Sequence, residues 1–304
     1  MARRSTEFQR TAAIALALAC LAAPVRAQES TNPREAMPER PTVATHAYTV
    51  AAGIVELETG VQWQRPTPGA GLLSGPTLFK IGLGRKLQLD IAPGWARVEQ
   101  DSNGQVGLSD LVVGVKWQLA EHLPVLADFS VQPTLKIPTG SLRRGTGTGT
   151  TDVNILLISS RKVGPVSLDL NAGYTRRSGD GSNAPKDSTL WTVSTGTPIV
   201  GDLQWEAEIF GYPGTSGPAG YAPIVAFLTG PAFEVHPSLV LDAGVILNIT
   251  GYGGTAIYAG MTWNMGRLPG NYAPTTLKSS WSRSSFTGPC ASQRTMPCRS
   301  ISTR

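Results

Sequence analysis

Charged side chains recur at every second position along several apolar stretches of this 304-residue chain. Glu56 and Glu58, for example, alternate with Val55, Leu57 and Thr59. Successive side chains of a β-strand point to opposite faces, so both carboxylates would lie on the polar face of a strand whose other face is apolar. Carboxylates gathered on one face can attract a cation, accept hydrogen bonds from a solute or pair with a base on another strand.

The same alternation places nine acids and three bases on one common face, which would be the inside of a closed sheet. These candidate lumen residues are Glu56, Glu58, Lys80, Asp90, Lys116, Asp128, Lys136, Asp152, Asp169, Glu206, Glu208 and Asp242. Two hypotheses follow. In the first, an acidic pore favours cations or hydrogen-bonds a polar group of a substrate. In the second, the charges pair across a narrow lumen, fix the register and conduct nothing.

The elements that must carry these residues are about twelve strands, predicted from period-two alternation. They cover residues 53–64, 77–83, 87–95, 111–119, 125–137, 152–159, 166–174, 189–199, 203–209, 223–235, 239–249 and 257–265. Short turns near residues 84, 121, 162, 201 and 236 alternate with longer loops at 65–76, 98–108, 138–150, 176–188 and 212–222. An even strand count with this asymmetry is typical of bacterial outer-membrane barrels. We therefore predict an all-β fold, an antiparallel transmembrane β-barrel of about 12 strands over residues 51–268.

Two other fold classes fit the pattern less well. A soluble sandwich also alternates, but its polar face meets bulk water. Here that face is poor in Lys and rich in Gly, Asn, Gln and isolated acids, which suits a confined lumen. A helical transporter is excluded, because no stretch after the N-terminus approaches the roughly 18–20 continuous apolar residues that a spanning helix needs.

The two ends of the chain differ from the body. Residues 1–27 combine a basic start, an apolar run over 12–23 and the small-residue sequence Val25-Arg26-Ala27, which predicts a cleaved secretory signal peptide. Residues 28–50 lack periodicity and predict a flexible N-terminal lead-in, and residues 269–304 predict a disordered basic tail. The chain's formal charge of +5 comes from these ends, and the body between them is net acidic. A nucleic-acid partner is therefore excluded.

Catalysis and cofactor binding find little support. The chain has three histidines, His46, His122 and His236, and all are expected on short turns or before the first strand, away from the outer leaflet. None is placed to activate a serine there, so we predict no enzyme and no catalytic residue. Residues 145–149 are Gly-rich, but no Lys-Ser/Thr pair or helix follows them as in a phosphate cradle. We therefore predict a mobile outer loop, free or folded into the pore. We predict no cofactor and no metal site.

Four motifs, taken in their order and spacing, resemble the bacterial outer-membrane family named for the MetA pathway of phenol degradation. They are Gly53-Ile54-Val55-Glu56-Leu57-Glu58-Thr59-Gly60, Ser109-Asp110-Leu111-Val112-Val113-Gly114-Val115-Lys116-Trp117, Pro133-Thr134-Leu135-Lys136-Ile137-Pro138-Thr139-Gly140 and Gly147-Thr148-Gly149-Thr150-Thr151-Asp152. The resemblance spans roughly residues 50–267 and implies a twelve-stranded channel for small molecules, including aromatic or other apolar ones. The tail after Leu268 departs from the family pattern, since such barrels generally end on an aromatic residue.

These inferences predict an outer-membrane channel or transporter of a Gram-negative bacterium, with an acidic polar lumen. The alternative is a structural or binding barrel whose lumen is plugged and does not conduct. The partners expected for this protein are outer-membrane lipid, a small-molecule solute and the barrel assembly machinery.

Overall fold

The computed structural model describes residues 32–65, 69–100, 103–180, 185–213, 223–251 and 254–270. These residues form antiparallel strands and one short 3-10 helix, η1 (Leu142–Arg144). The strands are β1 (Ile54–Arg65), β2 (Ala70–Gly82), β3 (Leu87–Ala92), β4 (Gly94–Gln100), β5 (Asn103–Leu108), β6 (Leu111–Leu123), β7 (Ala127–Ile137), β8 (Asp152–Val163), β9 (Val166–Arg177), β10 (Asp187–Val200), β11 (Leu203–Tyr212), β12 (Ile224–His236), β13 (Leu239–Thr250) and β14 (Thr255–Arg267). No helix in this part of the chain is long and apolar enough to cross a bilayer.

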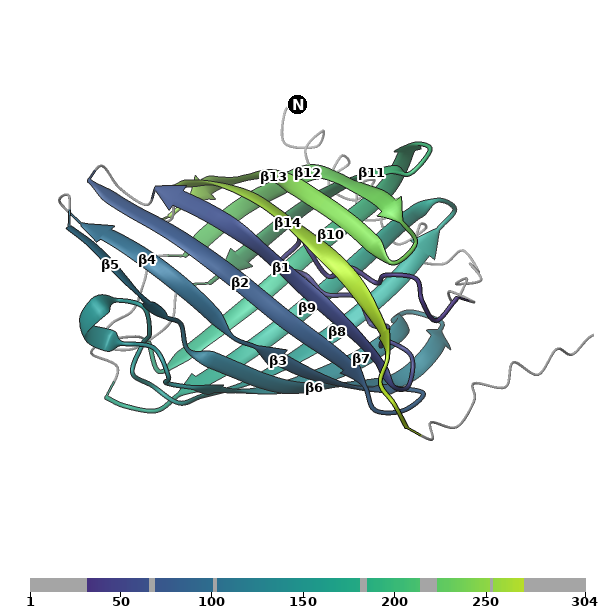
Figure 1. The fold of residues 1–304 in the computed structure, drawn as a ribbon, viewed down its shortest axis with the longest axis horizontal. Coiled ribbons are helices and arrows are strands. Elements are labelled where there is room, and N and C mark those ends of the chain that lie inside the picture. The colour runs from purple at the N-terminus through teal and green to yellow at the C-terminus, as the bar shows by residue number, and fades with distance from the viewer. Residues whose placement is uncertain are drawn as a thin grey trace, which may run out of the picture. The chain divides into compact units, whose positions relative to one another are not determined.

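The sheet closes on itself because β1 pairs with both β14 and β2 (Figure 1). Going round the ring, β2 is followed by β3, then β6, and then by β7 to β14 in sequence order. The ring therefore has twelve strands, which confirms the predicted antiparallel barrel. Closure leaves no free edge along the ring, as a sheet in lipid requires.

Strands β4 and β5 continue β3 and β6 toward one end of the barrel. β3 and β4 pair with β2 in one unbroken register and are separated only at Pro93, which has no N–H to donate. β5 and β6 are separated by Ser109 and Asp110, where the register against the neighbouring strand shifts by one residue. Such a bulge redirects the side chains that follow it.

The two ends of the barrel differ in their connections. At one end, here called the turn end, the strands are joined by short turns such as residues 164–165, 201–202 and 237–238. The opposite, loop end carries the longer connections 138–151 and 178–186. The predicted loops at 65–76 and 98–108 are wrong in most of their length, since β2 begins at Ala70 and the β4–β5 hairpin occupies much of the second range. Their Gly and Pro content concealed strands that are stabilised by pairing with neighbours.

The two faces of the wall have opposite chemistry. Large apolar side chains are exposed on the outer face, among them Val61, Trp63, Trp117, Leu157, Val193, Leu247 and Trp263. Polar and charged side chains are buried on the inner face, among them Glu56, Gln88, Lys116, Ser130, Thr192, Glu208 and Thr262. This is the reverse of a soluble protein, in which burial of apolar surface drives folding, and it requires an apolar surrounding medium.

Residues 32–53, here called the lumenal segment, lie inside the barrel and contact its wall on opposite sides (purple in Figure 1). The prediction of a flexible lead-in over residues 28–50 did not include the hydrogen bonds that join residues 32–50 to the wall. These residues have no period because their backbone bonds to wall side chains instead of joining a ladder. The predicted signal peptide, and the predicted tail beyond residue 270, lie outside the described residues.

Candidate functional site

Carboxylates of β1 hold the first part of the lumenal segment. Glu56 Oε2 accepts a hydrogen bond from the backbone N–H of Met37 at 2.9 Å, and Glu58 Oε1 accepts one from Glu39 at 2.8 Å. The Lys80 ammonium on β2 lies 2.6 Å from a carboxylate oxygen of each of these two acids. All three wall side chains are buried, and a buried charge persists only when it is paired and hydrogen-bonded. The two acids therefore serve as docking groups for the segment.

The opposite wall binds the middle of the segment in the same way. Glu208 on β11 accepts hydrogen bonds from the backbone N–H groups of Val43 and Ala44, at 2.7 and 2.8 Å. Asn171 on β9 accepts from the N–H of Thr45 at 2.7 Å and donates to its carbonyl at 2.9 Å. Two wall side chains thus satisfy backbone groups of three segment residues, which a neighbouring strand would otherwise pair.

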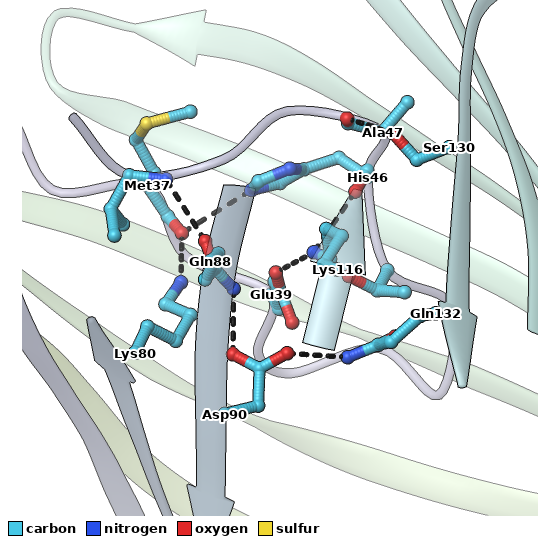
Figure 2. Close-up of polar contacts among 12 residues, drawn as sticks. Met37, Glu39, His46, Ala47, Lys80, Gln88, Asp90, Lys116, Ser130 and Gln132 are labelled. Carbon is cyan, nitrogen blue, oxygen red and sulfur yellow. Dashed lines mark hydrogen bonds and ion pairs between the residues drawn. The ribbon is translucent and has the colours of Figure 1, made fainter. Parts of the chain in front are cut away.

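The last part of the segment is bonded by hydroxyls and amides. Ser160 Oγ on β8 accepts from the N–H of Ala47 at 2.7 Å, and Ser130 on β7 donates to the Ala47 carbonyl (Figure 2). Gln88 on β3 accepts from the N–H of Val50 at 2.9 Å. Because three strands contribute to these contacts, the segment is bound along its length and not at one point.

Two ion pairs join charged side chains of the segment to the wall. Lys116 on β6 pairs with Glu39 and also donates to Thr45 Oγ1 at 2.8 Å and to the His46 carbonyl at 3.1 Å (Figure 2). Arg40 pairs with Asp242 on β13 at 3.2 Å. Both charges of each pair are largely buried. Removal of either partner would leave the other charge uncompensated and would destabilise the docked segment.

Two glycines make room for the Arg40 guanidinium. Gly60 on β1 and Gly260 on β14 lie opposite each other in the ladder, and Asp242 is the next residue across. A Cβ at position 60 would lie 2.7 Å from Arg40 Nη2, and one at position 260 would lie 2.5 Å from it. The guanidinium therefore rests directly on the backbone of two strands, in a space that only glycine leaves open.

His46 and Glu39 are the titratable groups of the segment nearest Lys116. Burial, together with the nearby Lys116 ammonium, lowers the pKa of His46 to about 3, so the imidazole is neutral at pH 7. Burial opposes ionisation of Glu39, but Lys116 and Lys80 outweigh it and hold the pKa of this carboxyl well below its usual range. The segment therefore presents one anion and a neutral imidazole to the lysines of the wall.

Asp110, at the bulge between β5 and β6, organises the loop end of the barrel. Its carboxylate accepts hydrogen bonds from the backbone N–H groups of Gly140 and Thr148, both at 3.0 Å, and pairs with Lys136 at 3.1 Å. Lys136 also lies 3.0 Å from Asp152, to which Arg177 approaches within 3.2 Å. The connection 138–151, which includes the Gly-rich 145–149 stretch, is thus bound to the wall.

An apolar patch lines part of the lumen wall between β11 and β14. Its buried members are Phe210, Ala226, Leu228 and Tyr258, and Ile246 and the segment residue Val43 pack against them. The Tyr258 hydroxyl is buried without a hydrogen-bond partner among the described residues. The lumen is therefore not uniformly polar.

Nine of the twelve predicted lumen residues are buried, and Lys136, Asp169 and Glu206 are half-buried. Seven contact the lumenal segment directly, namely Glu56, Glu58, Lys80, Lys116, Asp128, Glu208 and Asp242. Asp90 bonds Gln88 and Gln132 at 2.7 Å each, and Asp169 accepts from Ser160 (Figure 2 shows Asp90). Lys136 and Asp152 lie in the Asp110 network, and Glu206 faces Gly196 across the β10–β11 pair.

Sequence reasoning missed the groups that meet these residues. Glu39, Arg40 and His46 belong to the lumenal segment, whose sequence has no period to place them. Gln88 and Asn171 are uncharged, although their even spacing from Asp90 and Asp169 was a usable signal that they face inward. Asp110 stands in a quoted motif but outside the alternation, because the bulge interrupts it.

A closed antiparallel barrel with an apolar outer wall and a polar lumen defines the class of outer-membrane β-barrels. A family model described as "Putative MetA-pathway of phenol degradation" matches residues 39–264. The chain belongs to this family. The match begins at Glu39, so the family pattern includes the part of the lumenal segment that docks on Lys116 and Asp242.

Two solved structures are reported as similar to the chain, and the first of them supports the fold. The COG4313 outer membrane channel from Pseudomonas putida F1 is similar with a TM-score of 0.55 and 11% identity, over 79% of this chain and 100% of that one. The NanC porin gives a TM-score of 0.46 and 10% identity, over 68% and 98% of the two chains. None of the curated protein sequences compared with the chain matches it.

Proposed function

We propose that this protein is an outer-membrane channel for small molecules in which the lumenal segment is the gate. The observation that carries the proposal is the set of hydrogen bonds from wall side chains to the backbone of the segment, supplied by β1, β3, β8, β9 and β11. A backbone held by side chains can be released without breaking any strand pair of the barrel. Release of the segment would thus open the lumen and leave the wall intact.

The acidic lumen has a different role in each state. With the segment bound, Glu56, Glu58 and Glu208 are occupied by its backbone and by Lys80. With the segment displaced, nine wall acids would face three wall lysines, and the pore would favour cations or solutes that donate hydrogen bonds. We therefore assign cation preference to the open state alone.

The apolar patch favours solutes with an apolar or aromatic part. Phe210, Leu228 and Tyr258 would contact a ring or an alkyl chain, once Val43 leaves with the segment. Aromatic side chains recognise aromatic solutes through stacked or edge-to-face contacts. A small molecule with an apolar body and a polar group would therefore find both surfaces in one lumen.

The test is conductance of the purified protein in planar bilayers, together with solute flux into liposomes. Wild-type protein should conduct poorly, and Arg40→Gln should raise both the open probability and the flux of a small aromatic solute. Arg176→Gln is the matched control, since this exposed arginine pairs with Asp187 at the loop end. Absence of current and flux in both proteins would exclude a channel and favour the plugged, non-conducting barrel.

We propose no catalytic role. His236 bonds Ser238 Oγ at 2.9 Å, but Nδ1 also accepts from the Ser238 backbone at 3.2 Å, which is a local turn contact. His122 lies near the end of β6, and His46 lies within the lumen. This arrangement supports reading all three as structural residues.

A further inference from the structure

A groove of about 230 Å³ lies on the outside of the barrel, over β1, β2 and β4 near the loop end. Its lining residues are Trp63, Leu72, Leu73, Arg97 and Glu99. Trp63 lies opposite Leu73 in the β1–β2 ladder, and Leu73 lies opposite Arg97 in the β2–β4 ladder. The three side chains therefore form one row across neighbouring strands, on the face where Trp63 and Arg97 are exposed.

Two glycines let the Glu99 and Arg97 side chains lie close to the backbone. Gly71 pairs with Glu99, and a Cβ at position 71 would lie 3.0 Å from a carboxylate oxygen of Glu99. Gly104 pairs with Glu99 from β5, and a Cβ there would lie 3.1 Å from Arg97 Nε. These two charged side chains therefore line the groove beside Leu73, which forms its apolar floor.

The walls of the groove carry guanidinium groups. Arg65 lies over the Trp63 ring, with Cζ 5.1 Å from its centroid, which is a cation–π contact. Arg97 pairs with Glu99 at 2.8 Å through Nη2, and half of its side chain surface is exposed. One carboxylate against two guanidiniums leaves the area net positive.

We propose that this groove binds a phosphorylated lipid of the outer leaflet, with an acyl chain along Leu73 and Trp63 and a phosphate between Arg65 and Arg97. The apolar floor faces the membrane, which a soluble anion would not need. The guanidiniums suit a phosphate, to which Arg donates in pairs, and an uncharged lipid would leave them unused. The long loops of such a barrel are extracellular, so a groove near the loop end lies at the level of the outer leaflet. The occupant is therefore a phosphorylated lipid of the outer leaflet, for which lipid A serves as the probe.

Native mass spectrometry of the detergent-purified, full-length protein tests this proposal. Wild-type protein should retain added bisphosphorylated lipid A. It should bind the dephosphorylated form of this lipid roughly tenfold more weakly. Arg65→Gln combined with Arg97→Gln should show the same loss with intact lipid A. Arg176→Gln, an exposed loop-end arginine outside the groove, should bind as wild type does.

Three outcomes would overturn the proposal. These are equal binding of the two lipid A forms, unchanged retention by the double variant, and full displacement of lipid A by inorganic phosphate, which would assign the site to a free anion. Heat-modifiable gel mobility verifies that each variant is folded. If the double variant does not fold, the comparison of the two lipids on wild-type protein still decides.

Discussion

Arg40 Nη2 lies 3.2 Å from Asp242 Oδ1, and this ion pair joins the lumenal segment to a strand 202 residues further along the chain. The Asp242 side chain is buried and that of Arg40 nearly so. The pair rests on Gly260, which no other residue could replace without moving the guanidinium. The pair forms only when the barrel closes around the lumenal segment, and it motivates the first prediction.

Gly260→Ala should detach the segment at Arg40 without removing any charge. The added Cβ would lie 2.5 Å from the guanidinium, so Arg40 must leave Asp242. We expect faster hydrogen exchange in residues 37–44 and higher conductance. Gly266→Ala is a poor control because its φ is 96°, but Gly84, which has open space around it, gives a suitable Gly84→Ala control. Equal exchange in both variants would contradict the proposed cradle.

Glu208→Ala should loosen the middle of the segment. Its removal leaves the N–H groups of Val43 and Ala44 without acceptors, at a cost of about 1–3 kcal/mol each. The expected result is faster exchange of these two amides. Glu206→Ala is the matched control, because its side chain has no hydrogen bond among the described residues and lies on the same face of β11. Similar exchange in the two variants would mean that the carboxylate does not hold the segment.

Mild acid should favour release of the segment. His46 faces Lys116, Glu39, Lys80 and the Met37 carbonyl, and burial beside Lys116 lowers its pKa to about 3. A released segment would have the ordinary value of about 6.5, so the docked state binds fewer protons between these values. The stability of docking is therefore complete above about pH 6.5 and falls as the pH drops toward 3.

Conductance compared at pH 7 and pH 5 measures this effect, because Glu39 begins to contribute only below its ordinary pKa of about 4.5. Wild-type protein should open more at pH 5, and His46→Gln should remove most of the difference. A pH response that survives in His46→Gln would assign the effect to other groups.

Asp110→Asn should release the 138–151 connection at the loop end. Burial raises the pKa of Asp110, but the hydrogen bonds from Thr148 and Gly140 and from Lys136 outweigh it, so the pKa lies below its usual range and the group is anionic. The variant should be cut faster by trypsin after Arg143 or Arg144, which lie in η1. Asp187→Asn, in the Arg176 pair, is the control and should leave this cleavage unchanged. No increase in cleavage would show that Asp110 does not restrain the connection.

The barrel could be predicted because the direction of each strand side chain follows from the local sequence pattern. The alternation of Glu56 and Glu58 with apolar neighbours places them on one face, and the same rule predicts an inward Asp169 although its strand is shifted by one. Asp169 accepts a hydrogen bond from Ser160. Strand edges were less predictable: β2 extends to Ala70 through Gly71 and Gly75, which carry no side chain to show a period. Pairing with β1 and β4, not propensity, holds that part of the strand.

The sequence by itself determined a twelve-stranded wall, its apolar outside and its charged inside, because side-chain direction in a strand follows from position alone. Only the tertiary structure decided what those charges do. Glu56, Glu58 and Glu208 could have lined an open pore, and instead they accept hydrogen bonds from residues 37–44. The lumenal segment has no ladder and no period, since its partners are side chains from strands far apart in sequence. Such partners meet only when the barrel closes. For this reason no local sequence pattern predicted these contacts.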